Sequence, residues 1–385
     1  MFASRVDWDL RTNRLSRSLE EHRRQGRALL DLTESNPTRA GLTAPPDVLA
    51  LLGDRGGVLY EPSPKGLIGA REAVSREYAR QGLEVPAEGI VLTASSSEAY
   101  AFLFKLLCDP GDRVLVPEPS YPLFAYLATL ESVEVWPYPL HYDGEWRIDR
   151  GALETIPPRT RAIVAVNPNN PTGSFVSAGD KEALRSIAAA HGLALISDEV
   201  FGDYAFKPAG AGSASLFAPD GPLVFCLGGL SKSCGLPQLK VGWMAVGGTA
   251  REAALSRLEV IGDTYLTVGT PAQRALPEIL ARRRELQEPI TARLRTNLST
   301  LEAKVRPDGP VSLLPPEGGW SAVLRIPATV SEEEWALLLL EKDGVLVHPG
   351  YFFDFPSEAY LVVSLLAGER AFAEGVDAIL ERVSA

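Results

Sequence analysis

One lysine, Lys232, lies in a turn rich in glycine and serine between two apolar runs, in the segment "LGGLSKSCGLPQLKVGWM". A surface lysine usually has charged neighbours, whereas Gly229, Ser231, Cys234 and Gly235 surround this one. A lysine held near buried surface tends to lose its proton and to become a nucleophile. The pattern therefore predicts a chemical role for Lys232.

Polar side chains also follow two other apolar runs that we predict to be strands. Ser95, Ser96 and Ser97 follow "GIVLT" and open a predicted helix, where hydroxyls and backbone N–H groups suit a phosphate. Ordinary N-capping is the alternative. The segment "NPNNPTG", residues 167–173, follows "RAIVAV" and combines two Asn-Pro steps with a glycine. Such a constrained turn favours a function over a plain loop.

Two further strand ends complete the set. Tyr121 follows "RVLVPEPS", with core packing as the alternative, and Asp198 follows "LALIS", with N-capping as the alternative. The set supplies the groups that pyridoxal phosphate needs. The aldehyde of this cofactor needs a lysine, and its ring nitrogen needs a carboxylate. Its ring needs an aromatic neighbour, and its phosphate needs the N–H donors at a helix end.

The composition limits the remaining possibilities. The 385 residues suit two domains, and a formal net charge of −11 argues against a nucleic-acid partner. The three cysteines and four histidines have no metal-ligand spacing, so we expect no metal site and a reducing compartment. We see no run of about 18 apolar residues and no signal peptide at "MFASRVDWDL". We therefore expect a cytoplasmic protein without a membrane partner.

Strand-like runs alternate with helical ones from about residue 68 onward, which predicts an α/β fold. We expect a large cofactor-binding domain at residues 46–270, with a mostly parallel sheet flanked by helices. A smaller α+β domain then comprises residues 271–385 and the N-terminal arm, residues 1–45. Because parallel sheets place ligands at the carboxyl ends of their strands, the polar side chains above should lie together.

The chain resembles the fold-type I pyridoxal-phosphate enzymes of the class I/II aminotransferase family, which are related to the aspartate and alanine aminotransferases. The resemblance covers almost the whole chain. "NPNNPTG" matches Asn-Pro-x-Asn-Pro-Thr-Gly, "SDEVF" matches Asp-Glu-x-Tyr, and "LSKSCGLPQLKVGW" matches the lysine motif. The resemblance implies the fold of the pyridoxal-phosphate-dependent transferases. It also implies aminotransferase activity, in which an amino group moves between an amino acid and a 2-keto acid.

The resemblance also implies roles for single residues. Lys232 would form the Schiff base and move the proton between the substrate Cα and the cofactor C4′. Asp198 would pair with the pyridinium nitrogen, and Asn170 would contact the phenolic oxygen. The other cofactor-binding residues implied are Tyr121 against the ring, Ser95, Ser96, Ser97, Ser231 and Lys240 around the phosphate, and Tyr60 in "YEPSPKG", reaching the phosphate of the neighbouring subunit in a homodimer.

Three departures from the family pattern concern the cofactor. Phe201 replaces a tyrosine whose phenol bonds the cofactor oxygen, so we expect the Schiff base to titrate at a higher pH unless Tyr204 or another donor substitutes. Lys240 replaces an arginine, and a point charge makes a less directional phosphate contact than a guanidinium fork does. Gly229 replaces a serine and removes a phosphate ligand.

A fourth departure concerns the substrate. Val362 occupies the position of the family's carboxylate-binding arginine in its Tyr-x-Arg-x-Ser pattern. We expect Arg39, in "ESNPTRAG", to be the replacement cation, with Lys65 and Arg325 as weaker candidates. Trp320 should line the pocket, and with Tyr121 and Phe352 it would favour alanine-like, branched or aromatic side chains over a second carboxylate.

Other functions stay open at this point. The missing arginine admits a lyase, a decarboxylase or a cyclising synthase on the same fold, because the anchoring of the carboxylate decides which Cα bond breaks. A cofactor-binding regulatory module is disfavoured, since only residues 1–30 precede the fold and the chain is acidic.

Overall fold

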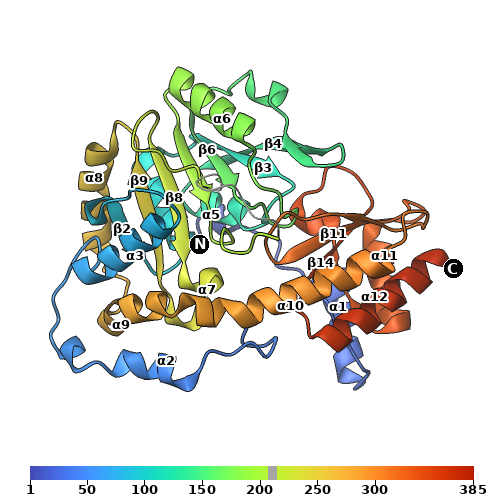
Figure 1. Ribbon diagram of the computed structural model, residues 1–385. Helices are drawn as coiled ribbons and strands as arrows, with labels where there is room; N and C mark the ends of the chain where they lie inside the picture. Colours follow the sequence, from blue (N-terminus) through green and yellow to red (C-terminus); the bar gives the residue numbers. More distant parts are fainter. Residues whose placement is uncertain (207–214) are drawn as a thin grey trace.

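The computed structural model describes residues 1–206 and 215–385, and its larger sheet has eight strands in the order β2-β9-β8-β7-β6-β3-β4-β5 (Figure 1). These strands are β2 (Ile90–Thr93), β3 (Arg113–Glu118), β4 (Glu134–Tyr142), β5 (Trp146–Ile148), β6 (Thr160–Val166), β7 (Ala194–Asp198), β8 (Val224–Gly229) and β9 (Gly242–Gly247). The five strand-like runs that carry the polar residues are β2, β3, β6, β7 and β8. The predicted α/β fold is confirmed.

The direction of the strands decides which side chains meet. Strands β4, β3, β6, β7 and β8 are mutually parallel, and β9 lies antiparallel between β8 and β2. Strand β2 therefore runs in the same direction as β8, and its carboxyl end lies at the same edge of the sheet. Strand β9 follows the lysine segment directly, and no separate strand was predicted there.

Helices cover both faces of this sheet. Helices α3 (Ile68–Arg80), α6 (Ala178–His191) and α9 (Thr270–Ala281) pack on one face, and α4 (Ser96–Leu107), α5 (Phe124–Leu130) and α8 (Arg251–Tyr265) on the other. Along β6, Ile163 and Ala165 face the first group, whereas Ala162 and Val164 face the second. This alternation explains why a strand buried on both sides is apolar throughout.

A second sheet, of order β10-β11-β14-β13, forms the smaller core. Its strands are β10 (Ser312–Leu314), β11 (Ser321–Arg325), β13 (His348–Pro349) and β14 (Tyr360–Ser364). Helix α11 (Glu332–Leu338), the π-helical turn η7 (Leu339–Asp343) and α12 (Glu369–Ser384) pack around it. The N-terminal arm joins this core through α1 (Arg14–Arg24) and through β1 (Leu30–Asp31), which pairs in parallel with β12 (Val345–Leu346).

Helix α10 (Arg283–Lys304) joins the two cores and crosses the lower part of Figure 1. Its Leu286 packs with the larger sheet, while Ile290 and Leu294 pack with the smaller one. The two cores therefore meet within α10, after the 12-residue helix α9 that follows the predicted boundary at residue 270.

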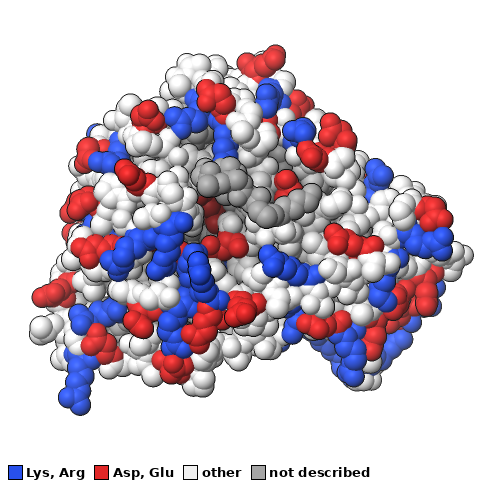
Figure 2. Space-filling model, viewed as in Figure 1, with Lys and Arg blue, Asp and Glu red and all other residues white. Residues whose placement is uncertain are grey.

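The remaining elements are short. They are η1 (Ser4–Val6), α2 (Pro46–Ala50), η2 (Leu51–Gly53), η3 (Arg55–Val58), η4 (Ala87–Gly89), η5 (Gly151–Leu153), α7 (Leu230–Ser233), η6 (Pro237–Leu239) and η8 (Gly350–Phe353). Basic and acidic side chains intermix over the face in Figure 2. Among the described residues, no helix is both long enough and apolar enough to cross a bilayer.

Candidate active site

A cavity of about 320 Å³ opens at the carboxyl edge of the larger sheet. It brings together most of the residues that the sequence singled out, from five separate strand ends and from the smaller domain. Those lining it are Ser95, Ser96, Ser97, Tyr121, Asn170, Asp198, Ser231, Lys232, Lys240 and Trp320.

Lys232 occupies the short helix α7, directly after β8. Its Nζ lies 5.0 Å from the centroid of the Trp320 ring and 5.5 Å from that of Phe201. Burial lowers the pKa of the Lys232 amine, and the nearby Asp198 carboxylate opposes this effect. The site thus makes the unprotonated, nucleophilic amine more accessible than it is in water.

Asp198 ends β7 and is only 9% exposed. The Tyr100 hydroxyl donates to its Oδ2 at 3.3 Å, and the Val200 N–H donates to its Oδ1 at 3.3 Å. Even so, burial raises the pKa of Asp198 to about 6. A buried carboxyl of this kind gains most from a ligand that brings a fixed positive charge, such as a protonated ring nitrogen.

The serine turn forms the N-terminus of α4, a helix of 12 residues. The Ser95 side chain caps the helix by accepting from the Glu98 N–H at 3.2 Å. The backbone N–H groups of Ser96 and Ser97 belong to the first turn, where a helix has no carbonyl for them. The exposed Lys240 lines the same cavity, and unpaired N–H groups beside a cation are the chemistry that an anion such as phosphate requires.

The glycine at position 229 has a steric cause. A Cβ at Gly229 would lie 3.2 Å from both the Gly242 Cα and the Val241 carbonyl oxygen. A Cβ at Gly242 would in turn approach the Ser95 backbone to 3.0 Å. The lysine segment and the serine turn therefore approach so closely that the serine of the family pattern fits at position 229 only if the backbone shifts.

Asn170 and Tyr121 present a donor and a ring to the cavity. The Ser321 hydroxyl donates to Asn170 Oδ1 at 3.3 Å, which leaves the amide N–H groups for a ligand. The ring of Tyr121 follows β3 and is 43% exposed. The donor set of the cavity thus fits pyridoxal phosphate, with an amine, a carboxylate, an amide, a ring and an anion site in one place.

Tyr204 does not supply the phenol that is missing at Phe201. The Phe201 ring packs edge-on against Trp320 at 5.3 Å between centroids. The hydroxyl of Tyr204 instead donates to the Lys232 carbonyl at 2.8 Å and to the Ser233 carbonyl at 3.2 Å. Tyr204 therefore contacts the backbone behind the lysine, and it does not replace the missing phenol in the cavity.

The structure does not bring Arg39 into the cavity. Its side chain is 70% exposed, and its Nε pairs with Glu34 at 3.0 Å. Lys65 pairs with Glu259 at 3.7 Å, and Arg325 is exposed on β11. Val362 is buried in an apolar cluster with neighbours that include Val323. None of the four lines the cavity.

Two other predicted residues also lie outside it. Tyr60 is 71% exposed and lines a different, smaller cavity. Phe352 packs against the apolar clusters of the smaller domain.

Sequence reasoning missed several residues of the site. Ser35, Phe124, Ser321 and Ser364 line the cavity, and Tyr100 bonds Asp198 from behind. Tyr100 had a usable signal, because it lies one helical turn after Ser96 and so faces the same side of α4. Ser321 and Ser364 had none, since they come from β11 and β14 of the smaller domain.

Comparisons with known proteins agree with this geometry. The family model "Aminotransferase class I and II" matches residues 28–370. The glutamate-pyruvate aminotransferase AlaA of Escherichia coli is 29% identical over 352 residues, which are 89% of this chain and 86% of that protein. An alanine aminotransferase of Mycobacterium tuberculosis is 29% identical over 377 residues, 92% of this chain and 85% of the relative.

Solved structures share the fold. An aminotransferase from Escherichia coli superposes with a TM-score of 0.87 at 26% identity, covering 100% of this chain and 98% of that one. An alanine aminotransferase from Pyrococcus furiosus superposes with a TM-score of 0.90 at 22% identity, covering 100% and 99%.

The raised pKa of Asp198 predicts how cofactor-free protein responds to pH. The pKa of Asp198 in the folded protein, about 6, exceeds its ordinary value of 3.8, so ionising this carboxyl destabilises the fold. The destabilisation is absent below about pH 4 and reaches its full size above about pH 6. Asp198→Asn removes that cost. We expect its free energy of unfolding to exceed that of the wild type by about 1–3 kcal/mol at pH 8 and to match it near pH 4.

Urea denaturation at both pH values measures this difference. Asp220, whose side chain is 83% exposed, supplies the matched control in Asp220→Asn, which should show no such dependence. An Asp198→Asn protein less stable than the wild type at pH 8 would contradict the assignment of a destabilising buried charge.

Proposed function

The chain belongs to the class I and II aminotransferases, and from this premise we propose that Lys232 is the lysine that holds the cofactor and moves the proton. Enzymes of this family transfer an amino group with pyridoxal phosphate, which ranks amino transfer ahead of the lyase, decarboxylase and synthase alternatives. One observation carries the proposal. The buried Lys232 amine, whose pKa is lowered, and the buried Asp198 carboxyl, whose pKa is raised, line one cavity at the carboxyl edge of the sheet.

Each residue then has a defined task. When bound, pyridoxal phosphate supplies an aldehyde for the amino group and a ring that withdraws electrons from the substrate Cα. The Asp198 carboxylate would keep a proton on the ring nitrogen, and the Lys232 Nζ would move a proton between the substrate Cα and the cofactor C4′. Asn170 would donate to the phenolic oxygen, and the ring of Tyr121 would lie against the cofactor ring.

The phosphate would be held by the serine turn, Ser95 to Ser97, together with Ser231 and Lys240. All of them line the cavity on the side of α4 and α7. Lys240 contributes a charge without the two-pronged geometry of arginine. The backbone N–H groups of α4 would therefore do most to orient the phosphate.

We further propose that neutral donors bind the substrate carboxylate. The indole N–H of Trp320 is buried and has no hydrogen-bond partner among the described residues, and it belongs to a side chain that lines the cavity. After a side-chain shift that opens it to the cavity, this N–H would receive a carboxylate together with the amide of Asn170 and the hydroxyl of Ser35. The competing arrangement, in which Arg39 serves, requires that guanidinium to leave Glu34.

The amino donor would carry a small or apolar side chain. Trp320, Phe201 and Phe124 give the cavity apolar walls, and two of the relatives bear the names of alanine and glutamate-pyruvate aminotransferases. Amino acids such as alanine and the matching 2-keto acids are therefore the proposed substrates. A cytoplasmic location is consistent with three free cysteines and stays a prediction.

We also propose a homodimer. Val58, Leu59 and Tyr60 form an exposed apolar stretch, with exposures of 84%, 70% and 71%. Apolar stretches of this kind mark interaction surfaces. In a dimer, Tyr60 would reach the phosphate of the neighbouring subunit.

The first prediction from this proposal concerns the site of attachment. Protein loaded with pyridoxal phosphate and reduced with borohydride should carry the pyridoxyl group on Lys232, as located by peptide mass spectrometry. Lys232→Ala should carry none and should lose on the order of 10⁴-fold in kcat. Lys105→Ala, in the last turn of α4 and paired with Glu131, is the control and should behave as the wild type. Attachment at another lysine would refute the assignment.

The second prediction separates the two carboxylate arrangements. If neutral donors bind the carboxylate, Trp320→Phe should raise the KM for L-alanine about fivefold or more by removing one donor. Arg39→Gln should then change that KM less than about twofold, as expected for an exposed charge. The opposite result, a large effect at Arg39 alone, would assign the carboxylate to the guanidinium.

The third prediction tests the dimer. Sedimentation equilibrium should give twice the chain mass, and Leu59→Glu should shift the protein toward monomer and weaken its hold on the cofactor. The control Val330→Glu places the same charge at an apolar side chain that is 39% exposed on the smaller domain. A wild-type protein of single-chain mass at micromolar concentration would exclude the dimer.

A further inference from the structure

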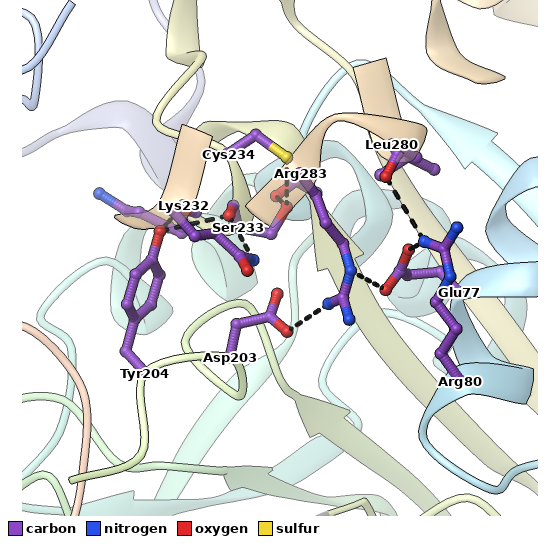
Figure 3. Close-up of polar contacts among 11 residues, drawn as sticks. Glu77, Arg80, Asp203, Tyr204, Lys232, Ser233, Cys234, Leu280 and Arg283 are labelled. Atoms are coloured by element: carbon purple, nitrogen blue, oxygen red, sulfur yellow. Dashed lines mark hydrogen bonds and ion pairs between the residues drawn. The ribbon is translucent and has the colours of Figure 1, made fainter. Parts of the chain in front are cut away.

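The backbone carbonyls that end the lysine helix are held by side chains from two other elements. Helix α7 has only four residues, too few to persist without support. The last carbonyls of a helix have no partner within it, and beyond α7 the Gly235 N–H donates to the Lys232 carbonyl at 3.3 Å. Here the Tyr204 hydroxyl donates to the carbonyls of Lys232 and Ser233, and the Gln287 Nε2 donates to the Ser233 carbonyl at 2.8 Å. Figure 3 shows Tyr204 reaching the backbone at this point.

Tyr204 is itself fixed on every side. It is 2% exposed, and its ring packs edge-on against Trp320 at 5.3 Å between centroids. Its chain neighbour Asp203 pairs with Arg283 at 3.1 Å, and Arg283 also pairs with Glu77 of α3 at 2.6 Å (Figure 3). The loop that begins at Asp198 is thereby tied both to the lysine helix and to the start of α10.

Gln287 lies one turn after Arg283 on α10, so a single helix supplies both contacts. Farther along, Arg293 and Asn297 of α10 donate to the backbone carbonyls of residues 365–367, directly after the cavity residue Ser364. One continuous helix therefore holds the lysine turn at one end and the turn of the smaller domain that lines the cavity at the other.

From these contacts we infer that Tyr204 and Gln287 are positioning residues that hold the Lys232 turn at the cofactor. The inference rests on the proposed function of Lys232. Neither side chain touches the cavity, and both act through the backbone of residues 232–233. A side chain that carries a proton between two carbon atoms must return to the same place in each turnover, and the end of a single-turn helix does not provide that by itself.

The contacts predict an unequal effect on kcat and KM. A looser α7 lowers the population of Lys232 in reach of the substrate Cα, so kcat falls. The amino donor competes with Lys232 for the same cofactor carbon, so a weakened lysine linkage does not impair donor binding. Damage to the fold as a whole would also lower kcat at constant KM, so kcat is expressed per chain that carries the cofactor on Lys232.

The test compares Tyr204→Phe and Gln287→Leu in the loaded enzyme with Tyr138→Phe. Tyr138 is also 2% exposed, and its hydroxyl also donates to a backbone carbonyl, that of Val164 at 2.7 Å, so the control loses an equivalent bond away from α7. We expect Tyr204→Phe to lower kcat about five- to tenfold with KM for L-alanine unchanged within about twofold. Gln287→Leu should act in the same direction, and Tyr138→Phe should leave both constants near those of the wild type.

A second readout does not depend on turnover. Amide hydrogen exchange of residues 230–236 in the loaded protein should accelerate in Tyr204→Phe and Gln287→Leu and stay unchanged in Tyr138→Phe. Wild-type kcat and wild-type exchange in both variants would overturn the inference. Failure of the proposed function is a separate outcome, because it appears in the wild type as a cofactor that is not attached to Lys232.

Discussion

The buried carboxyl of Asp198 is the constraint on which the rest of the site depends. An acid at the end of a strand that is apolar on both faces meets a low dielectric, and two hydrogen bonds do not bring its pKa back to the ordinary value. Such a group is costly in an empty protein and favourable beside a fixed positive charge. The same setting lowers the pKa of the Lys232 amine. One cavity therefore holds Asp198, which a cation would stabilise, and Lys232, whose amine is prepared for nucleophilic attack. A protonated pyridine ring would pair with the carboxylate, and its aldehyde would react with the amine.

The sheet explains why these groups meet, and the second core explains how the cavity is closed. Parallel strands direct Asn170, Asp198 and Lys232 to one edge, and the antiparallel β9 brings the serine turn of β2 to the same edge. Ser321 and Ser364 reach the cavity from the smaller sheet. Because α10 packs into both cores and bonds both walls, the two halves of the site are held by one continuous helix.

Much of this site could be predicted from the sequence, because its cofactor residues lie in short motifs at strand ends. The lysine, the acid, the asparagine and the serine turn each follow a recognisable apolar run, and the structure brings them into one cavity. The residues that depend on tertiary packing were not accessible in this way. Tyr204 meets the Lys232 backbone only after the loop folds back, and the pairing of Arg39 with Glu34 depends on how their shared loop folds. The periodicity of α9 likewise does not reveal which of the two sheets the helix covers.

The most direct test of the account is a single-turnover experiment on protein loaded with pyridoxal phosphate, in which L-alanine is added without a keto acid. The account predicts that one pyruvate is released per loaded chain while the cofactor becomes pyridoxamine phosphate, and that Lys232→Ala gives neither product on the same timescale. Release of carbon dioxide or ammonia without pyridoxamine phosphate, or turnover by Lys232→Ala at the wild-type rate, would contradict it.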